Sequence, residues 1–95
     1  MKKEQIIEEL QKIKNVGPVM AKKLYDAEIY SLEEMVRIGT EDVYLMIDES
    51  GGFCGTHHAG YLYAIEAAII DCAWQDVPEN RKIELKEFSK SLRGG

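Results

Sequence analysis

Cysteine and long apolar runs are scarce in this sequence, and each scarcity excludes a class of protein. The chain of 95 residues has only Cys54 and Cys72, too few for the disulfide framework of a small secreted domain. No stretch approaches the roughly 18 apolar residues of a membrane span, and the start, Met1-Lys2-Lys3-Glu4, lacks the apolar stretch of a signal peptide. We therefore expect a cytoplasmic protein with reduced thiols and no membrane partner.

Proline and strand-like alternation are also scarce. The sequence has two prolines, and no segment alternates apolar and polar residues with the enrichment in β-branched types that is typical of strands. Apolar residues recur instead at helical spacing, and 45% of the residues are hydrophobic, enough for one ordinary core. The sequence predicts a single domain over residues 1–95 with an all-α fold, a compact bundle of about six short helices.

Turn and capping residues divide the chain into these helices. Ser31 and Glu34 form a capping-box pattern, Gly39 can close the helix that follows, and Thr40 can cap the next one. The glycines after Ser50 are expected to form a flexible loop. We expect helices over about 3–14 and 18–27, between Ser31 and Gly39, from Thr40 to Ser50, over 56–73 as the most apolar and central one, and from Pro78 onward.

Charge is unevenly spread along the chain, whose net charge is −5. Residues 1–24 carry a net charge of +3, residues 25–80 carry −11 and residues 81–95 carry +3. If the two basic ends lie on one side, they form a modest basic patch on a protein whose overall field repels nucleic acid. Solvated helix faces of mixed sign are the alternative.

The segment from Ile13 to Leu24 has the pattern of a helix-hairpin-helix motif. In such a motif the backbone N–H groups of the turn and of the following helix start can hold one phosphate, with an affinity that does not depend on base sequence. Asn15 replaces the usual first glycine but tolerates the left-handed conformation, whereas Pro18 removes one donor. A tight corner without a ligand is the alternative. The candidate nucleic-acid site consists of Lys14, Asn15, Val16, Gly17, Lys22 and Lys23.

Further segments in fixed order extend this pattern. They are Lys14-Asn15-Val16-Gly17-Pro18, Ala21-Lys22, Ile29 with Ser31-Leu32-Glu33-Glu34, Tyr63-Ala64-Ile65-Glu66-Ala67-Ala68, and Trp74-Gln75-Asp76-Val77-Pro78 with Arg81-Lys82. Over roughly residues 10–90 their order and spacing resemble the C-terminal domain of TfoX (Sxy), a bacterial competence regulator. The resemblance implies a part in transcription of DNA-uptake genes. Full-length relatives carry a further N-terminal α/β domain, so we expect this chain to be a stand-alone version.

Cys54, His57 and His58 are candidate metal ligands, with Cys72 as a more distant fourth. We expect no metal, because adjacent histidines point in different directions on a helix and Cys72 falls on an apolar stripe. A Cys54 thiolate of lowered pKa is the alternative, but no third member of a catalytic triad can be identified. The sequence therefore predicts no metal, no cofactor and no enzyme activity.

Two classes of function fit this sequence. In the first, the turn binds nucleic-acid phosphate weakly and without sequence preference, in transcription regulation. In the second, the same helices form a protein-interaction module or a homodimer contact, and the charge serves solubility. Phosphate binding requires the lysines of the turn, together with Arg81 or Lys82, on one face that is free of acidic residues.

Overall fold

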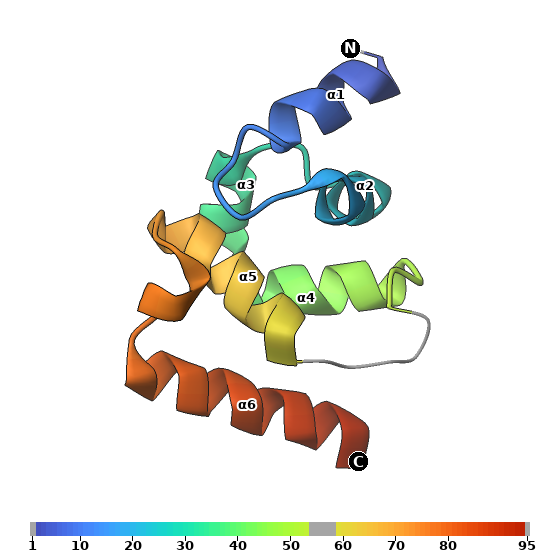
Figure 1. Cartoon of the computed structure of the whole chain (residues 1–95). Helices are drawn as coiled ribbons and strands as arrows, with labels where there is room; N and C mark the ends of the chain where they lie inside the picture. Colours follow the sequence, from blue (N-terminus) through green and yellow to red (C-terminus); the bar gives the residue numbers. More distant parts are fainter. Residues whose placement is uncertain (1, 54–58, 95) are drawn as a thin grey trace.

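Six α-helices and one short 3-10 helix make up most of the computed structural model, which describes residues 2–53 and 59–94. Those residues contain no β-strand (Figure 1). The prediction of an all-α fold with about six helices is therefore confirmed. The elements are α1 (Lys3–Leu10), α2 (Pro18–Asp26), α3 (Leu32–Ile38), α4 (Thr40–Glu49), α5 (Ala59–Ile70), η1 (Trp74–Asp76) and α6 (Glu79–Gly94).

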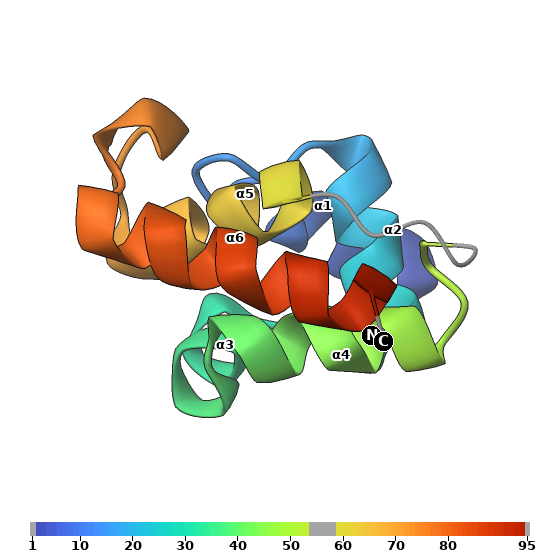
Figure 2. The same ribbon diagram turned by 90° about the horizontal axis from the view of Figure 1, so that it is seen from below.

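The helices lie in three layers, with α5 in the middle one (Figure 1). α1 and α2 pack on each other at one end, α3, α4 and α5 contact one another in the middle, and α6 runs along the opposite side against α5 (Figure 2). Leu62, Ile65 and Ala67 of α5 are buried. The expectation that this helix is central therefore holds for its described part.

The start of α3 follows the predicted cap, whereas the start of α4 does not. The Ser31 hydroxyl oxygen accepts a hydrogen bond from the Glu34 N–H at 3.1 Å, and the Glu34 carboxylate accepts one from the Tyr30 N–H at 2.6 Å. Thr40 was expected to cap α4 but is its first residue. Its hydroxyl donates instead to the buried carboxylate of Glu66, so a tertiary partner replaces the local one.

The connection between α1 and α2 is longer than the sequence predicts. α1 ends at Leu10 rather than near Lys14, and residues 11–15 form successive turns instead of a tight hairpin. The Ile13 N–H donates to the Leu10 carbonyl at 3.1 Å, and the Val16 N–H donates to the Ile13 carbonyl at 3.0 Å. The expected helix-hairpin-helix motif is not confirmed. Burial of Val16 in the core draws the segment inward and overrides the helical periodicity.

Helices α2, α4 and α5 end in the same hydrogen-bonded turn, the Schellman motif. In each turn one residue has a positive φ, and two N–H groups donate back to carbonyls of the last helical turn. The left-handed residues are Glu28 after α2 (φ 65°), Gly51 after α4 (φ 86°) and Asp71 after α5 (φ 56°). The glycines expected to form a flexible loop therefore lie in a closed turn, in which the Gly52 N–H donates to the Ile47 carbonyl at 2.9 Å.

We predict that Glu28→Gly raises the free energy of unfolding by about 1 kcal/mol, because glycine adopts a positive φ without the steric cost of a side chain. Asp71→Gly is expected to give a smaller gain, since aspartate tolerates this conformation better than glutamate does. Urea denaturation followed by circular dichroism measures both changes.

Gly51→Ala is the matched control for this prediction. A Cβ at residue 51 would meet no atom within 4 Å, so the expected loss of stability reports the backbone conformation alone. If Glu28→Gly is no more stable than the wild type while Gly51→Ala is destabilised, the left-handed conformation of Glu28 carries no steric cost and the prediction is wrong.

Candidate interaction site at the start of α2

The six residues predicted to bind nucleic acid lie on the α1–α2 connection and on α2, but they divide into two sets. One set is exposed to solvent, and the other set is buried or half-buried in the protein. The exposed set is Lys14, Gly17 and Lys22, and the inward set is Asn15, Val16 and Lys23.

Asn15 ties the connection to the far end of α5. Its φ of 72° confirms that asparagine occupies the left-handed conformation at this position. Its Nδ2 donates a hydrogen bond to the carbonyl of Cys72 at 2.6 Å. The side-chain amide is therefore used inside the protein, and it holds the connection against the residues that follow α5.

Lys23 is also used inside the protein. Its Nζ donates to the carbonyl of Gly52 and lies 5.5 Å from the ring centre of Phe53 and 5.6 Å from that of Tyr61. A Cβ at Gly52 would lie 2.5 Å from Cγ2 of Ile47, so only glycine brings this carbonyl so close to α4. Lys23 therefore links α2 to the segment after α4 through a hydrogen bond and a cation–π contact with Phe53, and to α5 through a cation–π contact with Tyr61.

The residue before α2 is Gly17, although the backbone conformation at this position does not require glycine. Gly17 has an extended backbone with φ −93°, and a Cβ there would meet no atom within 4 Å. The N-cap residue Gly17 has no side chain that could cap α2, and Pro18 has no N–H. Val16, by contrast, is buried in the core. The start of α2 is therefore exposed to solvent, whereas Val16 just before it is packed in the core.

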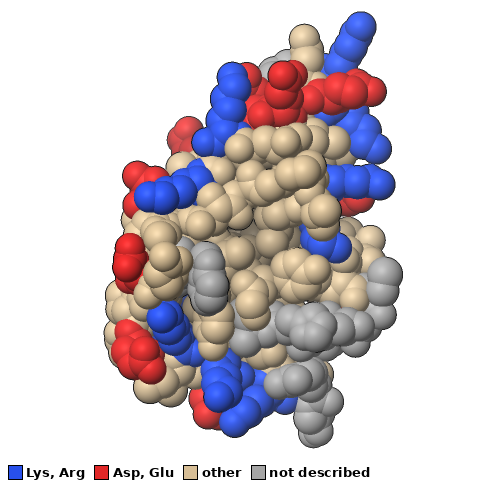
Figure 3. All heavy atoms as spheres, viewed as in Figure 1, with Lys and Arg blue, Asp and Glu red and all other residues tan. Residues whose placement is uncertain are grey.

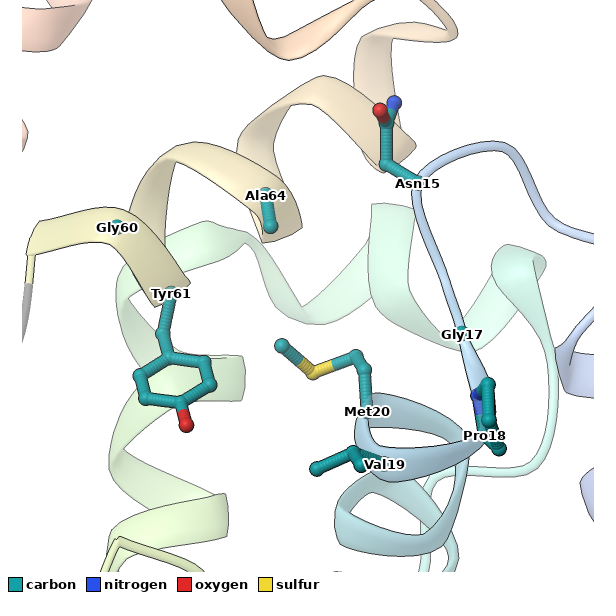
Figure 4. A pocket seen from close by; sticks show the side chains of 8 residues that line it. All are labelled: Asn15, Gly17, Pro18, Val19, Met20, Gly60, Tyr61 and Ala64. Atoms are coloured by element: carbon teal, nitrogen blue, oxygen red, sulfur yellow. The ribbon is translucent and has the colours of Figure 1, made fainter.

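A groove of about 570 Å³ lies between this turn and α5 (Figure 4). No charged side chain is among the residues that line it. Figure 4 shows the side chains of Met20 of α2 and Tyr61 of α5 extending into the space between the two helices, and Asn15 pointing away from it. The residues that line the groove are Asn15, Gly17, Pro18, Val19, Met20, Gly60, Tyr61 and Ala64.

Val19 at the edge of this groove is 64% exposed. Sequence reasoning missed the groove, because its walls come from segments about 40 positions apart and meet only in the fold. The available signals were an outward-facing valine in α2 and the small pair Gly60 and Ala64, one helical turn apart on α5.

Arg81, expected as a further phosphate contact, lies instead in a charge cluster that joins α4, α5 and α6. Its Nη2 lies 2.9 Å from Oε1 of Glu66 and 3.1 Å from Oε1 of Glu41. Glu66 is 7% exposed, and its Oε1 also accepts a hydrogen bond from the Thr40 hydroxyl at 2.5 Å. Glu66 therefore pairs with the first turn of α6 and does not face solvent.

The cluster shifts the pKa of each titratable member. Burial acts to raise the pKa of Glu66, but the hydrogen bonds from Arg81 and Thr40 outweigh burial and hold that pKa below its ordinary value. The hydrogen bonds from Arg81 also lower the pKa of Glu41, and both carboxylates raise the pKa of Arg81. At neutral pH all three groups are therefore charged.

The basic patch that phosphate binding requires is reduced to two lysines. Arg81 is held by acids, and Lys82 donates to the carbonyl of Gln75 at 3.2 Å. Lys14 and Lys22 are exposed, and among the residues of 2–53 and 59–94 neither forms an ion pair. Figure 3 shows basic and acidic side chains mixed along the edges of the molecule, around a broad uncharged area. Nucleic-acid binding by this site stays a prediction.

Comparison with known proteins identifies the family. The family described as the TfoX C-terminal domain matches residues 6–89. The chain belongs to this family. A TfoX C-terminal domain is a non-catalytic domain of regulatory type. A triclinic crystal structure of an uncharacterized protein from Listeria monocytogenes is similar, with a TM-score of 0.82 and 33% identity over 90% of this chain and 93% of that one. None of the curated proteins matches.

The described part of this TfoX C-terminal domain holds no group of three or more potential metal ligands. Cys54, His57 and His58, which raised the question of a metal or a reactive thiol, lie outside the described residues. Cys72 is half-buried with a free thiol. Within the same described ranges, no helix is long and apolar enough to cross a membrane. The absence of a bound metal stays a prediction.

We predict that Arg81→Met lowers the free energy of unfolding by about 3 kcal/mol at about pH 7, because it leaves the carboxylate of Glu66 buried without its cation. In the wild type the folded-state pKa values of Glu41 and Glu66 are lowered. Their contribution to stability is therefore present above the unfolded pKa of about 4.3 and is lost as the pH falls through the folded values. The deficit of the variant should shrink at about pH 3.5.

Urea denaturation at the two pH values measures this deficit, and Glu84→Gln is the control. Glu84 lies 3.7 Å from Arg81 with its side chain 59% exposed, so its loss should change stability by less than about 0.5 kcal/mol. If Arg81→Met lowers the free energy of unfolding by the same amount at both pH values, the loss of the ion pairs is not the cause of its lower stability.

Proposed function

We propose that this TfoX C-terminal domain is a non-enzymatic binding domain that contacts another protein through the groove between α2 and α5. The observation that supports this function is the exposure of Val19 beside a groove whose lining carries no charge. Apolar side chains left in water at a concave surface are typical of interaction sites. We place this function in the cytoplasm on the composition, which has only two cysteines.

The lining of the groove favours binding over reaction. It includes no carboxylate, histidine, cysteine or lysine, the groups that catalytic sites use most often as acids, bases and nucleophiles. The arginine that could polarise a substrate, Arg81, is paired with Glu41 and Glu66. Such a lining is suited to contact an apolar surface of another molecule.

Site-specific photo-crosslinking in the organism that makes the protein tests this proposal. We expect a photoreactive residue at Val19 to give a discrete protein adduct. The same residue at Val36 should give none, because Val36 is a similarly exposed valine (53%) on α3 and does not line the groove. Adducts of equal yield from both positions, or none from Val19, would contradict a protein-binding groove.

Nucleic-acid binding is the second candidate function, in a regulatory role of the kind that the TfoX resemblance implies. The observation that favours it is the position of Lys14 and Lys22, both exposed and beside the uncapped start of α2. A helix start supplies N–H groups for a phosphate, and the lysines add charge. With two lysines that form no ion pair within the described residues and a net charge of −5, such binding would be weak and independent of base sequence.

Titration of labelled duplex DNA at about 20 mM and about 150 mM salt tests this second candidate. If the turn contacts phosphate, Lys22→Glu should weaken binding and lower the slope of log K against log salt by about 0.9. Lys86→Glu on the exposed side of α6 is the matched control and should change both quantities less. Binding that is undetectable at the lower salt would exclude the isolated domain as a nucleic-acid binder.

A further inference from the structure

We infer, on the basis of the protein-binding function proposed above, that the groove takes an amphipathic helix of a partner protein whose apolar residues are flanked by aspartate or glutamate. Small residues in the groove, an apolar edge and neighbouring lysines each limit what can bind there.

Small residues on both walls let the backbone of the partner come close. A Cβ at Gly17 or at Gly60 would meet no atom within 4 Å. Ala64 follows Gly60 by one turn of α5 and lines the same groove. Small residues at a contact allow two helix axes to approach to about 8 Å, the short end of the usual range. The groove is open to solvent rather than enclosed, so it suits the side of a helix better than a small molecule.

Apolar side chains on both walls supply the contact for such a helix. Met20 is buried at the base of the groove, Tyr61 is half-buried opposite it, and Val19 stands exposed at the edge (Figure 4). A partner helix that places apolar residues at positions i and i+4 would cover Val19 and meet the other two side chains. Helix-in-groove recognition uses anchors with this spacing.

Lysines beside the groove select the charge of the partner. Lys22 follows Pro18 by four positions and Val19 by three, so all three lie on the same strip of α2. Lys14 lies at the other end, next to the lining residue Asn15. Because Lys14 and Lys22 form no ion pair within residues 2–53 and 59–94, both are available to acidic side chains of a partner.

The overall charge favours an acidic protein segment over nucleic acid or a second copy of this chain. Residues 1–24 carry a net charge of +3, whereas residues 25–95 carry −8. A nucleic acid would face the field of this acidic remainder, while a short protein segment contacts the groove alone. A two-fold dimer through the groove would bring Lys22 of each copy toward its counterpart, and like charges would oppose it.

Selection from a random peptide library, displayed on phage and about 16 residues in length, tests the inference with the full chain as bait. We expect the enriched peptides to combine apolar residues at helical spacing with an excess of Asp and Glu over Lys and Arg. Enrichment should persist on Val36→Asp and disappear on Val19→Asp. Both valines are more than half exposed (53% and 64%), and circular dichroism will verify that both variants are folded.

The outcomes separate this inference from the function on which it rests. Peptides that depend on Val19 but show no acidic excess would overturn the acidic partner and leave a protein-binding groove. Failure to enrich any peptide that depends on Val19 would overturn both. Sedimentation of the protein alone gives the third outcome, because a dimer that Val19→Asp converts to a monomer would assign the groove to a second copy.

The best acidic peptide then measures the role of Lys22 directly. Its Kd, measured by fluorescence anisotropy, should rise about tenfold for Lys22→Glu and less than about twofold for the control Lys86→Glu. Equal effects of the two variants would show that net charge, and not the lysine beside the groove, determines binding.

Discussion

The burial of Glu66 constrains how α4, α5 and α6 fit together. A carboxylate in the most apolar helix stays ionised only if a cation and a hydroxyl reach it, and these groups come from two other helices, Arg81 in α6 and Thr40 in α4. A buried ion pair adds little net stability, but losing either partner leaves a charge that nothing compensates. The cluster therefore requires one relative placement of three helices, and it removes Arg81 from any role on the surface.

A cation also holds the opposite side of the bundle. Phe53 stacks on Tyr44 of α4 with ring centres 4.4 Å apart and lies 4.9 Å from the ring centre of Tyr61. The amine of Lys23 lies over Phe53 and Tyr61 and bonds to the carbonyl of Gly52. This arrangement fixes the wall of the groove that Tyr61 provides. The shape of the groove thus depends on Lys23, which is half-buried and does not line the groove.

Local chemistry predicted the parts of the fold that depend on neighbouring residues. The hydroxyl of Ser31 caps α3, Asn15 adopts a positive φ, and the stripes of apolar residues give six helices. Partners distant in the chain decided the rest. Whether Lys23 faced solvent depended on a carbonyl 29 positions away, and the surroundings of Arg81 depended on a glutamate 40 positions away. The groove was missed, because each wall has only a weak signal of its own and nothing in the sequence shows that the two walls meet.

The hydrogen bond between Asn15 and Cys72 imposes an order on the folding of the nascent chain. The two residues are 57 positions apart, and a ribosome that adds about 5–20 residues per second makes the second one roughly 3 to 11 s after the first. During that interval the Cys72 carbonyl that accepts the hydrogen bond from Asn15 does not yet exist. For part of it, α5 is also incomplete and cannot pack against Met20. The groove therefore forms only after α5, which supplies its second wall, has left the ribosome.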